Sequence, residues 1–394
     1  MTRLWEKGLP LDQRVLAFTA GEDHLLDARL VPYDVTGSVA HAEMLAAQGL
    51  ITDEDCEAIR NGLKKLEQGF ADGDWQIRLE DEDVHTALES RLTDLIGTAG
   101  GRLHLGRSRN DQVLTALRLY SLDAIDAVSK SISGLSLSLS ELAERQGATP
   151  LPGFTHMQHA MPSSVVLWSE GFIEAFEDDA AGLQAARRRL GKNPLGSAAG
   201  YGTPGLLIDR EMTTTALGFA ETQTPVTAVQ LSRGKAESGL LFELTLLVQD
   251  LGRLASDLLL FYTQEFTYIE LAPEVTTGSS IMPQKRNPDV LELIRASSAT
   301  SQACLNECLM ITAKLPSGYQ RDLQRIKAPL FRSIDLSLEC VDIMSYVLSG
   351  LKFRPENICL DENINAAGEA NELVSKEGIP FREAYRRVAE RYNK

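Results

Sequence analysis

The chain has 394 residues, of which 43% are hydrophobic and 24% are charged, the composition of an ordinary globular protein. Its formal net charge of -16 at pH 7 argues against nucleic acid or an anionic membrane as a partner, because both would repel it. The sequence shows no basic, apolar N-terminal signal and no long uncharged apolar run, so we expect a cytoplasmic protein. The cysteines are few and odd in number, which predicts reduced thiols that fill the core.

Helical periodicity dominates the chain. Apolar residues recur at three- and four-residue steps in five long runs: 110–145, 162–190 (with Pro162 at a helix N1 position), 232–270, 287–314 and 323–351. Strand alternation is scarce, and no Rossmann or barrel pattern appears. The sequence therefore predicts an all-α protein built on an elongated helix bundle. The shorter helices before the long runs and the break after them predict three domains, at 1–105, 106–351 and 352–394.

The third run places leucines on several of its faces, at Leu240, Leu241, Leu244, Leu246, Leu247, Leu251 and Leu254. A helix that is apolar nearly all round is a buried helix. We therefore expect other subunits to complete the bundle.

A first polar cluster, "GRLHLGRSRNDQ" (101–112), leads into the first long run. Arg107 and Arg109 offer guanidinium forks for carboxylates, and Ser108, Asn110 and Asp111 offer cap or ligand groups. A capped helix start with solvated arginines is the alternative, and this cluster alone does not decide between them.

A second cluster, "PGFTHMQHAMP" (152–162), precedes the second run. Its pair His156 and His159 has a spacing that metal sites use. No carboxylate or cysteine accompanies the pair locally, so we expect no metal there.

The third cluster, "GSSIMPQKRNP" (278–288), precedes the fourth run, where Asn287 and Pro288 predict an N-cap and N1 pair. The positive end of that helix and Lys285 favour negative charge that develops nearby. A loop serine could act as a base if donors stabilised its alkoxide. Glu292, just inside the helix, could pair with a histidine and raise its basicity. A decorated turn over a capped helix is the alternative.

Together these segments resemble a known family. "GSSIMPQKRNP" is similar to the mobile-loop motif of the fumarase/aspartase superfamily, and Gln284 together with "GRSRNDQ", "HTALE" (85–89) and "GFTHMQHAMP" resembles the argininosuccinate lyase family. The matches occur in the right order and cover nearly the whole chain. The resemblance implies a homotetramer with a twenty-helix bundle, in which three subunits contribute to each active site. It also implies the reversible elimination of fumarate from argininosuccinate to give arginine, the last step of arginine biosynthesis, with neither cofactor nor metal.

The resemblance also implies roles for individual residues. Ser279 matches the catalytic base, with Ser280 as the alternative, and Lys285 matches a residue that stabilises the carbanion as an aci-carboxylate. His156 matches the histidine of the acid side, polarised by Glu292, and its direct protonation of the leaving nitrogen is left open. The implied substrate contacts are His85, Thr86, Ser108, Arg109, Asn110, Thr155, Asn287, Tyr319, Gln324, Lys327 and, less closely matched, Arg233.

Three departures from the family pattern stand out. The chain reads "LWEKGL" (4–9) for the usual "LWGGRF", and the serine of the F-x-x-S-I-x-x-D pattern has no clear counterpart, with Asp23 and Asp27 as candidates to replace it. The chain also ends soon after "GIPFREAYRR", so we expect a short form with a reduced C-terminal domain and intact chemistry.

Two rival interpretations remain open. Adenylosuccinate lyase, a sister enzyme, should differ at Gln284 and "SRNDQ". An inactive scaffold, like the related lens crystallins, would not need to retain Ser279, Lys285, His156 and Glu292.

Overall fold

A computed structural model describes residues 12–392, so the altered segment "LWEKGL" lies outside the described residues. Most of the described chain is helical, and its strands form three two-stranded pairs. The prediction of an all-α fold is confirmed. None of the described helices is both long and apolar enough to cross a membrane.

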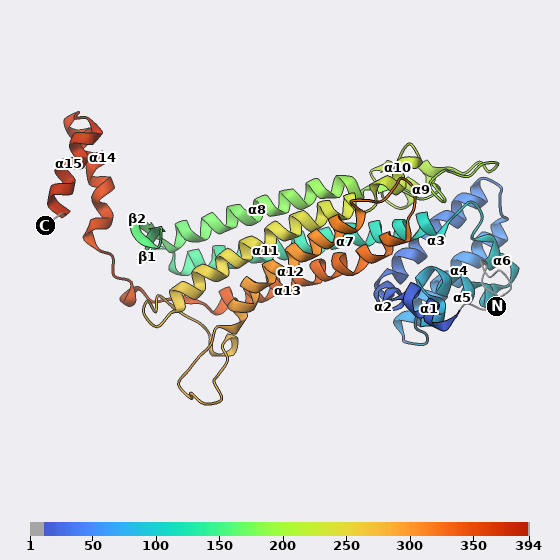
Figure 1. Cartoon of the computed structure of the whole chain (residues 1–394), viewed down its shortest axis with the longest axis horizontal. Coiled ribbons are helices and arrows are strands. Elements are labelled where there is room, and N and C mark those ends of the chain that lie inside the picture. The colour runs from blue at the N-terminus through green and yellow to red at the C-terminus, as the bar shows by residue number, and fades with distance from the viewer. Residues whose placement is uncertain (1–11, 393–394) are drawn as a thin grey trace. The chain divides into compact units, whose positions relative to one another are not determined.

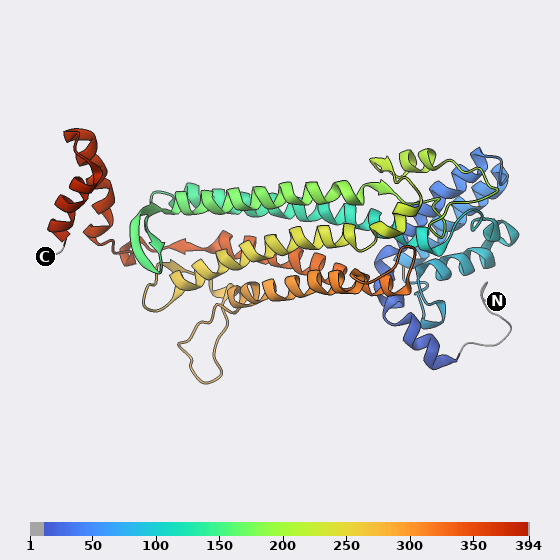
Figure 2. The same ribbon diagram turned by 45° about the horizontal axis from the view of Figure 1, so that its top comes forward.

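The chain forms two compact units, residues 1–128, 182–244 and 301–335 (unit 1) and residues 129–181, 245–300 and 336–394 (unit 2). The five long helices are α7 (Arg109–Gln146), α8 (Val165–Leu190), α11 (Lys235–Tyr262), α12 (Asp289–Thr312) and α13 (Lys327–Gly350). Each contributes a segment to both units, and within each unit these segments lie side by side (Figures 1 and 2). The three-domain division stays a prediction.

The remaining elements precede, separate or follow the long helices in the chain. The helices are α1 (Gln13–Ala20), α2 (Asp23–Leu26), α3 (Val31–Ala47), α4 (Asp53–Ala71), α5 (Val84–Ile96), α6 (Thr98–Arg102), α9 (Arg210–Ala216), α10 (Thr227–Ser232), α14 (Ala366–Glu377) and α15 (Phe381–Tyr392). The paired strands are β1 (Pro150–Thr155) with β2 (Gln158–Ser164), β3 (Lys192–Asn193) with β4 (Glu221–Thr222), and β5 (Ile269–Glu270) with β6 (Lys352–Phe353).

In unit 1, aromatic contacts fix the N-terminal helices to the long ones. The ring of Tyr120 on α7 lies 5.7 Å from Tyr33 of α3 and 4.9 Å from Phe331 of α13, centroid to centroid. Arg29 stacks over Phe331 at 4.6 Å and pairs with Asp335 of α13 at 3.0 Å. The segment from α2 to α3 is thereby held against the starts of α7 and α13, and this arrangement builds the walls of the site described below.

In unit 2, Trp168 of α8 is the centre of an aromatic cluster. Its ring lies 6.0 Å from Phe261 of α11 and 5.8 Å from Phe353 of β6, and its indole N–H donates to Asp257 at 3.0 Å. Helices α14 and α15 share a small core of their own, formed by Ala370, Ala384 and Val388.

Several helix starts differ from the predictions. The fifth long helix begins at Lys327 rather than 323, after a 3-10 helix over Arg321–Ile326. Pro162 does not begin a helix: it lies in β2 opposite Pro152, and α8 starts three residues later. Proline lacks an N–H and suits a strand position that donates no ladder bond. The third long helix begins at Lys235 rather than 232, because Gly234 has φ +77°, which is not a helical conformation. Glycine suits this position because a Cβ there would lie 2.2 Å from Thr312.

The leucines of α11 are mostly buried within the single chain. Six of the seven predicted to cover several faces are buried, and only Leu246 is 37% exposed. This helix alone is therefore weaker evidence for partner subunits than the sequence indicated. Large apolar side chains are exposed on other long helices, at Leu137, Leu167, Leu293, Leu309, Met310 and Tyr346.

The packing of α6 on α5 generates a stability prediction. A Cβ on Gly100 would lie 2.8 Å from the Cα and 2.9 Å from the N of Thr93, whereas a Cβ on the adjacent Gly101 would meet nothing within 4 Å. Gly100→Ala should therefore lower the free energy of unfolding by about 2 kcal/mol through overpacking, while Gly101→Ala should leave it unchanged or raise it by up to about 1 kcal/mol. Urea denaturation of both variants measures the difference. Equal effects of the two substitutions would show that α6 does not pack on α5 this closely.

Candidate active site

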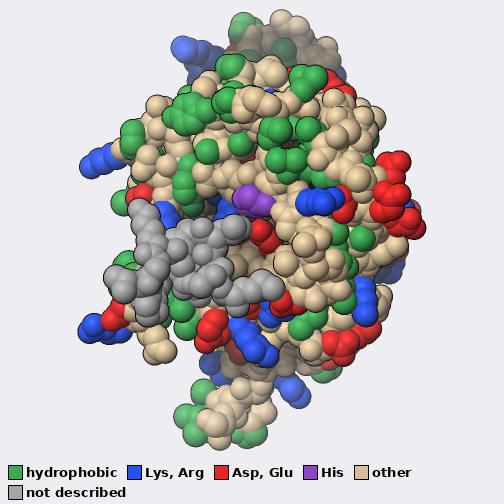
Figure 3. Space-filling view, turned by 90° about the vertical axis from the view of Figure 1, so that its right-hand side faces the viewer, with side chains coloured by type: hydrophobic (Ala, Val, Ile, Leu, Met, Phe, Trp, Pro, Cys, Tyr) green, Lys and Arg blue, Asp and Glu red, His purple; other side chains and the backbone are tan. Residues whose placement is uncertain are grey.

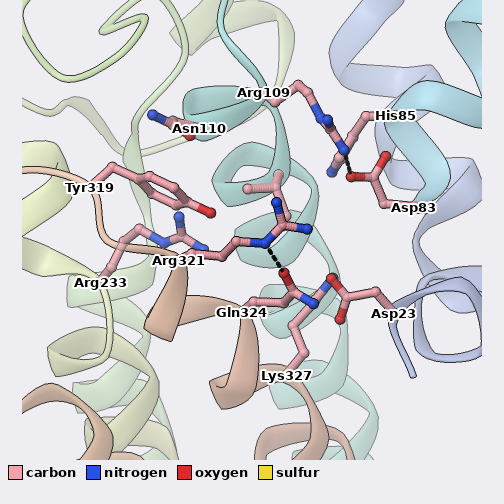
Figure 4. Close-up of a pocket in the computed structure, with 11 residues that line it drawn as sticks. Asp23, Asp83, His85, Arg109, Asn110, Arg233, Tyr319, Arg321, Gln324 and Lys327 are labelled. Carbon is pink, nitrogen blue, oxygen red and sulfur yellow. Dashed lines mark hydrogen bonds and ion pairs between the residues drawn. The ribbon is translucent and has the colours of Figure 1, made fainter. Parts of the chain in front are cut away.

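The start of α7 positions two predicted residues. The backbone N–H of Ser108 donates to Asp111 Oδ1 at 3.0 Å, and the Ser108 hydroxyl accepts from the N–H of Asn110 at 3.3 Å. Ser108 therefore caps the helix, while Arg109 and Asn110 extend into a cavity (Figure 4). Arg107 does not join them: it is buried and donates to Ser38 at 2.8 Å.

Asp111 fixes a distant loop to this helix start. Its second oxygen accepts from the backbone N–H groups of Gly196 and Ala198 at 2.9 and 2.7 Å. Burial raises the pKa of Asp111 to about 6, although these N–H donors and Arg107 act to lower it. Asp111 is thus a structural residue of the site rather than a ligand group.

The cavity measures about 180 Å³ and belongs entirely to unit 1. Its charged lining consists of four basic side chains (Arg109, Arg233, Arg321 and Lys327) and two acidic ones (Asp23 and Asp83). Its remaining lining consists of His85, Asn110, Val113, Tyr319 and Gln324. On the outer face seen in Figure 3, acidic side chains lie in several separate groups. A locally cationic cavity thus exists in a chain whose net charge is -16.

Lys327 forms one wall together with two carboxylates. Its Nζ lies 2.6 Å from Asp27 Oδ1 and 2.8 Å from Asp23 Oδ2. Burial alone would lower the pKa of Lys327, but the two carboxylates raise it. Burial raises the pKa of Asp23 to about 6 in spite of the ammonium beside it.

His85 lines another wall and pairs with a buried carboxylate. Its Nδ1 lies 2.9 Å from Asp34 Oδ2, and Gln112 Nε2 donates to both Asp34 oxygens at 2.8 and 3.1 Å. Burial alone would lower the pKa of His85, but the charge and hydrogen bond of Asp34, together with the charges of Asp83 and Asp27, raise it. His85 Nε2 is buried with no hydrogen-bond partner among the described residues. A molecule in the cavity could accept a hydrogen bond from it.

Arg109 pairs with Asp83, which is also the N-cap of α5. Burial alone would raise the pKa of Asp83, but Arg109 and other neighbours lower it to about 2. Thr86 donates to the same carboxylate through its N–H at 2.9 Å and its hydroxyl at 3.0 Å. Thr86 therefore belongs to the cap and does not line the cavity.

Arg233 is the cation whose hydrogen bonds are least complete. It is 5% exposed, and its guanidinium carbon lies 5.3 Å from the centroid of the Tyr319 ring. Its Nε and Nη1 have no acceptor in the described part of the chain. A buried charge whose hydrogen bonds are not made lowers the stability of the folded protein. A bound anion would supply the acceptors that these N–H groups lack.

Gln324 and Arg321 join the cavity to the end of α1. Gln324 Nε2 donates to the carbonyl of Thr19 at 2.9 Å, and its Oε1 accepts from Arg321 Nε at 3.1 Å. Gln324 therefore lines the cavity, but both its amide nitrogen and its amide oxygen already form hydrogen bonds within the protein.

Unit 2 presents the predicted acid-side residues on a hairpin. Thr155 pairs with Gln158, and the two residues between them, His156 and Met157, have φ of 52° and 60°. Positive φ at both central residues is the geometry of a type I′ turn. Thr155 and His156 are both exposed at this tip.

The predicted catalytic loop is also exposed and also belongs to unit 2. Thr277 and Asn287 exchange backbone hydrogen bonds at 3.0 and 2.8 Å and so close the base of the loop. Helix α12 begins after Pro288, so the predicted cap is displaced by one residue. Ser279 Oγ accepts from the N–H groups of Ile281 and Met282 at 3.4 and 3.2 Å. Lys285 and Glu292 are exposed.

The structure thus divides the predicted residues into two groups. The cavity of unit 1 gathers His85, Arg109, Asn110, Arg233, Tyr319, Gln324 and Lys327, with Ser108 and Thr86 as neighbouring caps. Unit 2 contains Thr155, His156, Ser279, Lys285, Asn287 and Glu292. None of these six lines the described cavity.

Sequence reasoning missed Asp83 and Arg321 as lining residues. The acidic residues of "EDEDVH" (80–85) are typical of a helix N-terminus, and an N-cap two residues before His85 lies at the same helix end. Arg321 lies three residues before Gln324, on the same short 3-10 helix. For metals, residues 12–392 contain no group of three or more His, Cys, Asp or Glu side chains that could bind an ion.

The pair of Asp34 and His85 generates a prediction about stability and pH. Asp34→Asn leaves a buried imidazole without its counter-ion, so it should lower the free energy of unfolding by about 3 kcal/mol and lower the pKa of His85. Because the pKa of His85 is raised in the folded protein, the pair adds to the free energy of unfolding. This contribution is complete below pH 6.5, the ordinary pKa of histidine, and is lost as the pH rises through the folded-state pKa. The lowered pKa of Asp34 likewise adds to the free energy of unfolding. This contribution is present above pH 3.8, the ordinary pKa of aspartate, and is lost as the pH falls through the folded-state pKa.

The stability difference between wild type and Asp34→Asn should therefore be largest between pH 3.8 and pH 6.5. Urea denaturation across that range measures it, and an NMR titration follows His85. Asp123→Asn is the matched control, because this exposed carboxylate accepts only from Tyr33 among the hydrogen bonds shown, at 3.0 Å, and should change stability by less than about 0.5 kcal/mol. A loss that is the same at every pH would contradict the assigned pairing.

Comparison with known proteins identifies the family. Residues 9–301 match a family model described as lyase. A curated argininosuccinate lyase of Thermotoga neapolitana is 40% identical over 394 residues, which cover 100% of this chain and 98% of that protein. The argininosuccinate lyase of Sorangium cellulosum is 42% identical over 98% of this chain and 90% of its own length.

Solved structures show the same fold. EDDS lyase in complex with formate superimposes with a TM-score of 0.79 at 25% identity, over 95% of this chain and 74% of that one. A class II fumarase of Schistosoma mansoni superimposes with a TM-score of 0.80 at 19% identity, over 98% and 91%. With the cationic cavity, the loop motif and these relatives together, the chain belongs to the argininosuccinate lyase family of the fumarase/aspartase superfamily.

Proposed function

We propose that this protein is an argininosuccinate lyase, which reversibly eliminates fumarate from argininosuccinate and releases arginine, the last step of arginine biosynthesis. The observation that supports this most strongly is a cationic cavity, with four basic and two acidic lining side chains, in a chain 40% identical over its whole length to a curated argininosuccinate lyase. The substrate has three carboxylates, one ammonium and one guanidinium group. Its net negative charge suits such a cavity.

The proposed chemistry removes a proton from the carbon next to a succinyl carboxylate. The electron pair of the broken C–H bond delocalises into that carboxylate as an aci-carboxylate. It then forms the double bond of fumarate as the C–N bond breaks, and the leaving nitrogen takes up a proton. Only a proton and electron pairs move within the substrate, so the reaction needs no redox partner.

Ser279 is our proposed base. Two backbone N–H groups already point at its oxygen, at 3.2 and 3.4 Å, which are long hydrogen bonds. They would shorten and strengthen as negative charge develops on the oxygen, and so would favour the alkoxide. No such donors are shown for Ser280. Lys285 and Asn287, on the same loop, would stabilise the aci-carboxylate.

His156, with Glu292 as its partner and Thr155 beside it, is proposed for the acid side. Thr155, His156 and Glu292 are all exposed in the single chain, and so are Lys285 and the apolar side chains of Leu293, Leu309 and Met310 on α12. Exposed apolar residues on long helices favour burial against other copies. We therefore propose a homotetramer in which three subunits contribute to each site, with His85, Ser108, Arg109, Asn110 and Lys327 binding substrate.

We also propose that the protein works in the cytoplasm. The five cysteines are all free thiols, and four of them are buried. Unpaired cysteines are typical of reducing compartments.

The test of the function is fumarate release with argininosuccinate and adenylosuccinate offered separately in the presence of a chelator. We expect release from argininosuccinate alone. Release from adenylosuccinate instead would retain the loop chemistry and overturn the substrate. Release from neither would favour the inactive scaffold.

The assignment of the base predicts a specific kinetic defect. Ser279→Ala should lower kcat by about 1,000-fold and leave KM within about threefold, because the hydroxyl acts on the transition state rather than on binding. Ser280→Ala is the matched control and should retain most of the activity. Steady-state assays of fumarate release compare them, with size-exclusion chromatography to check assembly. Near-normal turnover by Ser279→Ala, or the larger defect in Ser280→Ala, would transfer the role to Ser280.

A further inference from the structure

Two carboxylates, Asp23 and Asp27, pair with the single positive charge of Lys327. Asp27 is 0% exposed and lies 2.6 Å from Nζ, and its second oxygen accepts from the N–H of Val84 at 3.3 Å. Asp27 thus neutralises Lys327 within the protein. Asp23 adds a second negative charge at 2.8 Å, and its side chain retains 12% exposure where it lines the cavity (Figure 4).

Among residues 12–392, the ion pairs shown give Asp23 no basic partner other than Lys327, although the charge of Asp23 acts to raise the pKa of Arg233. Arg109 pairs with Asp83, and Arg233 lies against Tyr319. The hydrogen bonds of Arg321 go to Gln324 and to the carbonyl of Thr19, and its Nη2 lies 3.7 Å from Glu82 Oε2. Oδ1 of Asp23 accepts no hydrogen bond shown among residues 12–392. The pKa of Asp23, raised by burial to about 6, agrees with an incompletely stabilised carboxylate.

The cavity therefore has two kinds of wall. Arg233 has N–H groups without acceptors and so favours anions, whereas Asp23 beside Lys327 offers a negative and a positive group 2.8 Å apart. An α-amino acid group has the complementary pattern, with an ammonium and a carboxylate on one carbon. Both cationic groups of argininosuccinate are bonded to a carbon that carries a carboxylate, but the guanidinium belongs to the C–N bond that breaks and must face the proposed base and acid. None of those residues lines this cavity, so the ammonium is the group that fits Asp23.

We propose that Asp23 is the specificity residue that binds the α-ammonium of the amino-acid end of the substrate. This inference rests on the proposed function and adds to it the group that distinguishes an amino acid from its deaminated analogue. Asp23 occupies a stretch where the sequence departs from the family's serine pattern, and of the two candidate replacements only Asp23 lines the cavity.

The test uses the reverse reaction of the whole protein with fumarate. Two acceptors are compared: L-arginine and 5-guanidinopentanoate, which is arginine without its ammonium. Asp23→Asn retains the shape and an oxygen for Lys327 but removes the charge. It should lower kcat/KM for arginine about 30-fold, mainly through KM, and change that for 5-guanidinopentanoate by no more than about threefold. Asp23→Glu, which restores the charge, should recover part of the preference for arginine.

Glu22→Gln is the matched control, because Glu22 is the exposed neighbour of Asp23 and does not line the cavity. It should behave as wild type with both acceptors. If Asp23→Asn reduces both acceptors equally, or retains the wild-type preference, this inference is overturned and the proposed function stands. If the wild-type protein forms no product from fumarate and arginine and releases no fumarate from argininosuccinate, the proposed function fails and this inference fails with it.

Discussion

A buried ammonium must have partners, and at Lys327 this requirement determines how the cavity is built. Lys327 is 3% exposed, and removing its charge from water would cost several kcal/mol if it were unpaired. Its partners Asp23 and Asp27 lie about 300 residues away in the sequence. The pairing therefore brings the N-terminal segment to the start of α13. It fixes the positions of Asp23 and Lys327, which form one wall of the cavity.

The same rule explains which charges remain for a substrate. Asp34 orients His85 and acts to raise its pKa. Asp83 pairs with Arg109 and also caps α5. These pairs are internal, so they fix geometry more than they recognise ligands. The N–H groups of Arg233 that lack acceptors and the extra carboxylate of Asp23 are different, because the protein leaves them incomplete. Incomplete buried polar groups are costly for folding and useful for binding.

The sequence predicted the helical architecture well, because a period of 3.6 residues needs no knowledge of tertiary structure. It failed at Pro162 and before Lys235, where a hairpin and a glycine of positive φ interrupt apolar runs. In the site, motifs pointed to seven of the eleven residues that line the cavity. They missed Asp83 and Arg321, although these lie two and three residues from predicted site residues, because the sequence does not show that Asp83 pairs with Arg109 or that Arg321 reaches the carbonyl of Thr19. The roles in unit 2 come from the chemistry of the loop motif and from the family resemblance, and none of those residues lines the described cavity.

The hairpin of unit 2 adds an independent physical argument for the resemblance. His156 and Met157 both have positive φ. A two-residue turn of this kind favours Asn-Gly or Asp-Gly; histidine is enriched among the other residues with positive φ, whereas methionine is not. Each such residue costs on the order of 1 kcal/mol or more, and a turn of Asn-Gly would avoid that cost. His156 is exposed and Met157 is 65% exposed, so burial of these side chains in the single chain does not offset it. Strain retained at an exposed position favours a requirement for the side chain itself, and an imidazole at this tip is what the proposed acid side requires.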